Sequence, residues 1–210
     1  RILSEEANAA SRVKRDLPIM VVLGNPPYSA NSANKGNWII DLIHNSYYPN
    51  DEIKEHNPKF LLDDYVKFLR WGEWRIDRTG NGVMAVITNH GYLENPTFRR
   101  MRKNLMENFN EIYILNLHGS VKKREHSTDG SKDENVFDIQ QGVAISIFIK
   151  NREKTKSIEV HHAELWGTRE AKYEWLMKSD ISKTNWSIIK PQSPFYSFSL
   201  QDDSLMSEYT

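Results

Sequence analysis

The sequence predicts an α/β fold in which a mostly parallel sheet ends with an antiparallel strand. Three apolar runs of strand length alternate with segments of helical periodicity, and a fourth run follows the third without a helix between them. Strands that alternate with helices are typical of parallel sheets. Two successive strands with no helix between them are expected to pair antiparallel. The order strand, helix, strand, helix, strand, strand describes half of a doubly wound sheet.

The first strand is expected at residues 19–24, after a polar and helix-permissive segment at residues 1–17. Its apolar run stops at Gly24-Asn25-Pro26-Pro27-Tyr28. A short apolar run that ends at turn residues is typical of a strand buried on both faces of a sheet. Neither proline can donate a hydrogen bond to a sheet, so the strand must end by Gly24 or Asn25.

The remaining elements follow from apolar spacing and from turn residues. Residues 60–76 have apolar side chains at helical spacing, and the glycines at 80 and 82 close this segment. Further strands are expected at 82–88, 112–117 and 142–149, with helices from residue 37 and at 97–109. After residue 150 we expect a strand at 157–162, a helix at 168–177 and an extended run at 191–198. This change of character predicts two regions, 1–150 and 151–210.

The composition restricts the possible function classes. The 210 residues carry 28 basic and 28 acidic side chains, so any nucleic-acid surface must come from local clustering. There is no cysteine, which excludes disulfides and thiolate metal sites and favours a reducing, cytoplasmic compartment. No apolar run reaches membrane-spanning length. Because the sequence begins at Arg1, we expect it to be an excerpt of a larger protein.

The turn at residues 25–28 has chemistry suited to a ligand. Each proline has a fixed φ and no N–H, so the turn is stiff and presents carbonyl oxygens with few competing donors. These oxygens lie beside the Asn25 amide and the Tyr28 ring. In an open α/β sheet, ligands bind beyond the carboxyl ends of the strands, where this turn is expected. A rigid pair of acceptors beside a ring suits a flat heterocycle that carries an exocyclic amine.

The half-sheet and the Asn-Pro-Pro-Tyr turn together resemble S-adenosylmethionine-dependent methyltransferases that act on exocyclic or amide nitrogens. Residues 18–198 resemble the N6-adenine DNA methyltransferases, and most closely the methylase region of large single-polypeptide restriction-modification enzymes. Residues 135–143 (Asn-Val-Phe-Asp-Ile-Gln-Gln-Gly-Val) are similar to a segment in which an aromatic residue before the last strand faces the target base. The resemblance implies the carboxyl-terminal half of a Rossmann-like methyltransferase sheet, followed by the start of a region that leads towards target recognition.

The resemblance implies a role for each residue of the turn. The Asn25 oxygen and the Pro26 carbonyl accept the two N–H bonds of the adenine amine, so that its lone pair can attack the sulfonium methyl group. Asn25, Pro26, Pro27 and Tyr28 form the catalytic turn, and Asn25 and Pro27 also contribute to the cofactor site. The base must leave the duplex, and Tyr28 and Phe137 are expected to stack on its two faces.

The family's glycine-rich loop, and its acidic residue for the ribose, are not in this sequence. Both are expected upstream of Arg1, together with a helicase-like motor and a nuclease. This chain is therefore expected to contain only part of the S-adenosylmethionine site and to be inactive alone. No metal site is expected, since His161-His162 has no carboxylate at ligand spacing.

Several alternatives remain open at the level of sequence. The turn can simply end a strand, and Phe137 can be a core residue. Double-stranded DNA is the expected partner, and Lys122, Lys123, Arg124 and Gln140 are candidates for contacting it, but the acidic residues around the basic cluster favour a solvated loop. Arg99, Arg100, Arg102 and Lys103 are expected on the outer side of an amphipathic helix. Methylation of ribosomal RNA or of a protein glutamine is the second hypothesis, and a non-catalytic module is the third.

Overall fold

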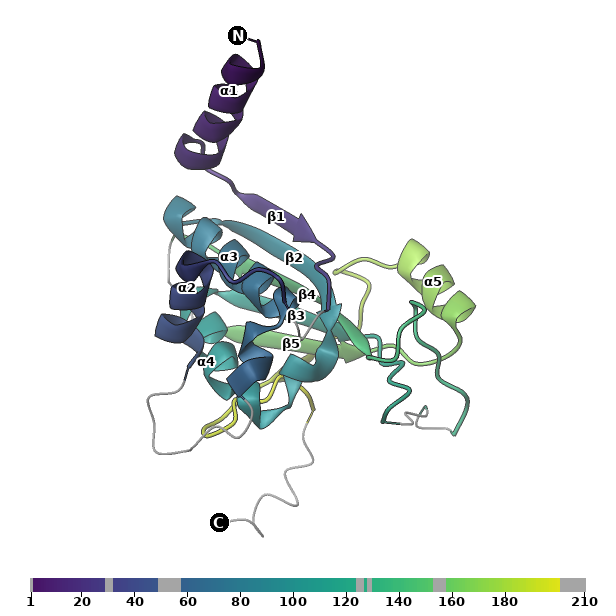
Figure 1. Ribbon diagram of the computed structural model, residues 1–210. Coiled ribbons are helices and arrows are strands. Elements are labelled where there is room, and N and C mark those ends of the chain that lie inside the picture. Colours follow the sequence, from purple (N-terminus) through teal and green to yellow (C-terminus); the bar gives the residue numbers. More distant parts are fainter. Residues whose placement is uncertain are drawn as a thin grey trace.

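The computed structural model describes residues 2–28, 32–48, 58–123, 127, 130–152 and 158–200 (Figure 1). A six-stranded sheet forms its centre, with the strand order β1-β2-β4-β3-β5-β6. The strands are β1 (Val21–Gly24), β2 (Gly82–Asn89), β3 (Glu111–Asn116), β4 (Val143–Lys150), β5 (Glu159–Glu164) and β6 (Ser187–Ile189). None of the helices in these ranges has both the length and the apolar character needed to cross a membrane.

The directions of the strands confirm the predicted fold class. β1 runs parallel to β2, and β3 runs parallel to β5. β4 lies between β2 and β3 and is antiparallel to both, as expected for two successive strands without an intervening helix. β6 is antiparallel to β5 at the far edge. Strands β1, β2, β3 and β5 therefore point one way, and β4 and β6 point the other way.

Helices α2, α3 and α4 cover one face of the sheet, whereas α1 extends away from it (Figure 1). The helices are α1 (Ile2–Asp16), α2 (Asn37–Tyr47), α3 (Asp64–Thr79), α4 (Arg99–Asn108) and α5 (Arg169–Lys178). Single 3-10 turns occur at Pro58–Leu62, His90–Leu93 and Pro96–Phe98. The expected helices and strands are thus confirmed, with shifts of a few residues at their ends.

The main core lies between these helices and the sheet. Its fully buried members include Leu69 of α3, Met84 of β2 and Phe148 of β4. α3 approaches the sheet closely at Gly72, where an added Cβ atom would lie 2.5 Å from the Met84 sulfur. Gly80 caps the carboxyl end of α3, and its φ of 83° is in the left-handed region that favours glycine. The expected turn after this helix is therefore confirmed.

The expectation that the first strand is buried on both faces is wrong. β1 is an edge strand, and 58% of Val21 and 73% of Leu23 are exposed. The apolar composition is that of a central strand, but in the described residues β1 pairs with β2 alone. The run therefore presents an apolar surface and an open row of backbone groups, which natural edge strands normally avoid.

The expectation that the α4 arginines lie on an outer face is wrong for Arg99 and Arg102, which are both buried. The Arg102 guanidinium donates to the carbonyl oxygens of Tyr92 at 2.7 Å and Asn95 at 2.9 Å, and to that of Phe195 at 3.0 Å. Backbone carbonyls thus replace the water that an outer arginine would contact. Burial lowers the pKa of Arg102 to about 9, which still leaves it charged at pH 7.

The chain after residue 150 continues the same sheet. β5 and β6 add two strands beyond β3, and Phe198 returns to the main core with no exposed surface. Residues 191–198 were expected to be extended, but they contain a turn in which the Tyr196 N–H donates to the Gln192 carbonyl at 2.7 Å. The division into regions 1–150 and 151–210 stays a prediction.

Candidate active site

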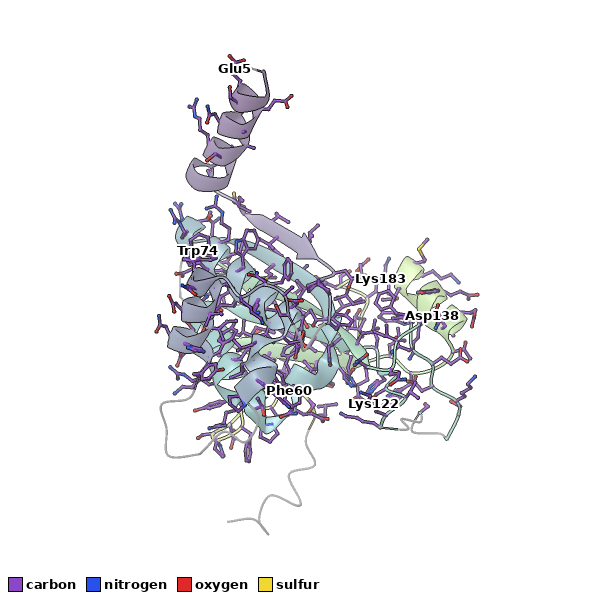
Figure 2. All side chains as sticks on the ribbon, viewed as in Figure 1. Glu5, Phe60, Trp74, Lys122, Asp138 and Lys183 are labelled. Carbon is purple, nitrogen blue, oxygen red and sulfur yellow. The ribbon has the colours of Figure 1, made fainter. Side chains whose placement is uncertain are left out.

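The candidate residues gather at one end of the strands, where the carboxyl ends of β1, β2, β3 and β5 lie. The Asn-Pro-Pro-Tyr turn follows β1 directly. Because β4 runs antiparallel to β2, the segment that precedes β4, residues 132–142, lies at this same end of the strands. Figure 1 shows α5 and the loops between β3 and β4 on this side, and in Figure 2 Lys122 and Asp138 lie there, on the side opposite Trp74. The topology therefore brings two distant segments to the edge at which α/β sheets bind ligands.

Tyr28 and Pro26 anchor the turn, while Asn25 and Pro27 are exposed. The Tyr28 hydroxyl lies 3.2 Å from Asn25 Oδ1 and 3.2 Å from the carbonyl oxygen of Ile87 in β2, and these two acceptors share its single proton. Its ring stands edge-on to the buried ring of Tyr65 at 6.3 Å. Burial raises the pKa of Tyr28 to about 12, so the phenol remains a donor at neutral pH.

Phe137 approaches the same region from residues 132–142. Its ring is half-buried, and its backbone N–H donates to Asn135 Oδ1 at 2.8 Å. Phe137 and Tyr28 both pack against a small apolar cluster, formed by Leu115, Leu117, Val136 and Val143. The structure therefore brings both expected aromatic residues to one cluster. Their roles as walls of a base pocket stay predictions.

A group of polar and aromatic side chains at this edge was not singled out from the sequence. His90 Nδ1 lies 3.1 Å from Asn116 Oδ1, which also accepts the His118 backbone N–H at 3.1 Å. The His118 ring stacks on Trp166 with centroids 3.3 Å apart, and its Nε2 lies 3.6 Å from Glu164. The adjacent His118 imidazole lowers the pKa of the Glu164 carboxyl. The sequence gives one indication that these residues lie together, which is that each of them ends a strand or follows one.

A cleft of about 920 Å³ opens beside Phe137. Its walls are residues 119–121, 132–135 and 137–140 and the start of α5, and they include Gln140 and Arg169. The cleft has acidic as well as basic side chains, namely Lys132, Asp133, Glu134, Asp138, Arg169 and Glu170. This mixture does not form a uniformly basic surface of the kind that phosphates require.

The expected DNA-contacting residues have different surroundings. Lys122 is exposed, whereas Lys123 forms an ion pair with Glu94. The Gln140 side chain is exposed, and its backbone carbonyl accepts from Val121 at 3.1 Å. Arg124 lies outside the described residues. Contact of these residues with DNA stays a prediction.

The two residues expected to contact the cofactor are accessible, and their contact with it stays a prediction. Asn25 and Pro27, the two positions expected to contact S-adenosylmethionine, are exposed at the end of an edge strand. A ligand can therefore reach them from the open side of β1. Among the described residues, no three His, Asp or Glu side chains are grouped so that they could hold a metal ion.

No protein-family model matches this chain, and a search of curated protein sequences finds no relative. Solved structures do match. The Type ISP restriction-modification enzyme LlaBIII bound to DNA, which is ATP-dependent, is 30% identical over 90% of this chain, with a TM-score of 0.72. A nuclease-deletion mutant of the Type ISP enzyme LlaGI, in complex with a DNA substrate mimic, is 26% identical over 96% of this chain, with a TM-score of 0.79. The DrdV–DNA complex is 25% identical over 94%, with a TM-score of 0.73.

This chain spans 13% of the LlaBIII chain and 20% of the LlaGI and DrdV chains. Nearly all of this chain is thus similar in fold and sequence to a segment of much longer proteins. Two of these are Type ISP restriction-modification enzymes.

Proposed function

We propose that this chain is the catalytic half of an N6-adenine DNA methyltransferase within a restriction-modification polypeptide. The observation that carries this proposal is the Asn-Pro-Pro-Tyr turn at the carboxyl end of β1, in a chain similar over 90% of its length to a segment of a DNA-bound restriction-modification enzyme. The turn supplies the acceptors that an exocyclic amine needs. The likeness supports DNA as the molecule that carries this amine.

The turn would activate the adenine amine by accepting hydrogen bonds from its two N–H groups. Asn25 Oδ1 already accepts from Tyr28, which orients the amide, and an amide oxygen has a second lone pair for the substrate. The Pro26 carbonyl would accept the other N–H bond. With both bonds directed at fixed acceptors, the nitrogen lone pair is withdrawn from the ring and faces the methyl donor. Positioning and electrostatic stabilisation are then the main sources of rate.

The target base would be held outside the duplex between Tyr28 and Phe137. A base extruded from the double helix loses the stacking contacts of its neighbouring bases, and aromatic side chains replace these contacts. Each base–aromatic stack contributes about 1–3 kcal/mol. The packing of Tyr28 and Phe137 on one apolar cluster supports this arrangement, because it fixes both rings relative to the same residues.

S-adenosylmethionine would supply the electrophilic methyl group. In this chain Asn25 and Pro27 would contact it, and the rest of its site would come from another part of the parent polypeptide. The open edge of β1 supports this division, because an apolar strand with unpaired backbone groups is suited to pair with a further strand. This chain alone is accordingly proposed to lack activity, and S-adenosylmethionine turnover by residues 1–210 alone would refute that.

The decisive experiment measures tritiated methyl transfer from S-adenosylmethionine to unmethylated plasmid by the full-length parent. We expect label at adenine N6, and a loss of at least about a hundredfold in Asn25→Ala. Asn151→Ala is the matched control, since this exposed asparagine follows β4 at the opposite edge of the sheet. Label on ribosomal RNA or protein instead of DNA would favour the second class of methyltransferase. No label anywhere, or full activity of Asn25→Ala, would overturn the proposal.

A further inference from the structure

The segment that carries Phe137 has no regular secondary structure. Residues 133–142 form neither helix nor strand, so no backbone ladder determines where the aromatic ring lies. Backbone hydrogen bonds hold the segment near its ends, where the Glu134 N–H donates to the Gly167 carbonyl and the Gln140 carbonyl accepts the Val121 N–H, so side chains have to position the part around the ring. Five polar side chains contribute to this: Asp133, Asn135, Arg169, Lys172 and Tyr173, whose hydroxyl donates to the Val136 carbonyl. The last three belong to α5, which follows residue 150.

Asp133 connects three segments of the chain through two hydrogen bonds and an ion pair. Its carboxylate accepts the Gly119 N–H at 2.8 Å, the Gly167 N–H at 3.0 Å and the Lys172 ammonium at 2.6 Å. Gly119 follows β3 and Gly167 follows β5. The start of the Phe137 segment is therefore fixed to the ends of two parallel strands.

Lys172 completes this connection from α5. Its ammonium donates to the carbonyl oxygens of Leu117 at 2.7 Å and Glu134 at 2.6 Å, in addition to Asp133. An ammonium has three N–H bonds, and all three have acceptors here. Both charged side chains of the pair are completely buried.

Asn135 and Arg169 hold the residues next to the ring. Asn135 accepts the Phe137 N–H and donates to the carbonyl oxygens of Gly119 at 3.0 Å and Gln141 at 2.7 Å. Arg169 Nε donates to the Asn135 carbonyl at 2.8 Å, and its Nη2 donates to the carbonyl of Phe137 itself at 3.1 Å. The backbone on both sides of the ring is thus bound directly.

We propose that Arg169 and the buried Lys172–Asp133 pair are positioning residues for base binding, acting through Phe137. This inference rests on the proposed function. α5 thereby belongs to the working base pocket, although it lies in the region that the sequence assigns to the trailing segment. Arg169 is the more informative residue, because it bonds to the Phe137 carbonyl and its side chain is one-third exposed, so its replacement leaves no buried charge unpaired.

Because Phe137 is proposed to stack on the base, the rate of methyl transfer should be sensitive to the position of the Phe137 ring. A ring contributes to holding an extruded base only while it remains in van der Waals contact with it, and displacements of about 1 Å can cost up to about a hundredfold in rate. Loss of the Arg169 bonds would release the Phe137 carbonyl without removing the ring. The effect of Arg169 must then depend on the presence of Phe137.

A double-mutant cycle in the full-length parent tests this dependence. Methyl transfer at saturating DNA is measured for wild type, Phe137→Ala, Arg169→Gln and the double variant. We expect a loss of about ten- to a hundredfold for Phe137→Ala and about tenfold for Arg169→Gln. The double variant should be no slower than Phe137→Ala alone, because the ring through which Arg169 acts is gone. Arg169→Lys retains the charge but not the two-pronged geometry, and it should be impaired like Arg169→Gln.

Lys178→Gln is the matched control, since this exposed α5 lysine is paired with Glu174 and should retain full activity. A double variant that loses the product of the two single losses would overturn the inference, and so would an unimpaired Arg169→Gln. These results differ from failure of the proposed function itself, in which the wild-type parent would transfer no methyl group to adenine and both proposals would fall. A thermal unfolding midpoint of Arg169→Gln equal to that of the wild type, together with slower methyl transfer, would support the inference, whereas a rate loss accompanied by a lowered midpoint would indicate general unfolding and overturn it.

Discussion

Lys172 Nζ lies 2.6 Å from Asp133 Oδ1, and neither side chain has any exposed surface. The two residues come from different segments of the chain, one before β4 and one in α5. A buried pair of this kind is costly to break, because removing one partner leaves a charge without solvent and without its counterion. It therefore makes the geometry of the Phe137 segment depend on α5.

Lys172→Met is expected to destabilise the local structure by about 3–5 kcal/mol, since it leaves the Asp133 carboxylate uncompensated. Amide hydrogen exchange in residues 132–141 of the parent measures this loss, which should appear as faster exchange. The double variant Asp133→Asn/Lys172→Met should lose less protection, because no charge remains unpaired. Lys178→Met, at an exposed ion pair, should change exchange very little. Equal protection in Lys172→Met and wild type would contradict this account.

Tyr28→Phe is expected to keep the stacking ring but to release Asn25 from its donor. One hydrogen bond contributes about 0.5–1.5 kcal/mol, so methyl transfer by the parent should fall about three- to tenfold. Burial raises the pKa of Tyr28 to about 12, which favours the protonated phenol well above neutral pH. Wild type and Tyr28→Phe should therefore have parallel rate profiles from pH 7 to pH 10. A wild-type decline near pH 10 that is absent from Tyr28→Phe would disprove this interpretation.

Leu23→Lys is expected to have opposite effects in the isolated chain and in the parent. In residues 1–210 alone, Leu23 is 73% exposed, so the variant should bind less of an apolar dye and should associate less. In the parent, where a further strand is proposed to cover β1, the same change should reduce methyl transfer, since full burial of a leucine contributes about 1.5–3 kcal/mol. Met177→Lys, at an 88% exposed position on α5, is the control. Undiminished transfer by the Leu23→Lys parent would show that β1 stays uncovered.

Arg102→Met is expected to destabilise the protein because the guanidinium donates hydrogen bonds to backbone carbonyls from two distant segments. Each buried carbonyl left without a donor costs about 1–3 kcal/mol. Limited proteolysis of the parent should then show earlier cleavage near residues 191–198, which Arg102 fastens to the main fold. Lys178→Met provides the comparison, since this exposed lysine of α5 forms an ion pair with Glu174 on the same helix. If the two variants were cleaved equally slowly, Arg102 would not be the fastening residue.

The sequence by itself determined the class of fold, the positions of most elements and the nature of the turn. These depend on local rules: apolar runs of a given length, helical spacing, and prolines that end a strand. The pairing of β3 with β4 also followed from connectivity, since no helix separates them. The roles of Asn25, Pro26, Pro27 and Tyr28 follow from resemblance and stay predictions.

Only the tertiary structure decided which residues are buried and which are not. The β1 run has the composition of a central strand, yet a strand's neighbours are chosen by the whole sheet, and β1 lies at its edge. Arg102 has the helical position of an outer residue, but a returning segment places carbonyls over it. Asp133 and Lys172 are 39 positions apart, and nothing local marks them as partners. Periodicity reports the preference of a side chain, whereas burial and pairing are set by segments that meet only when the chain folds.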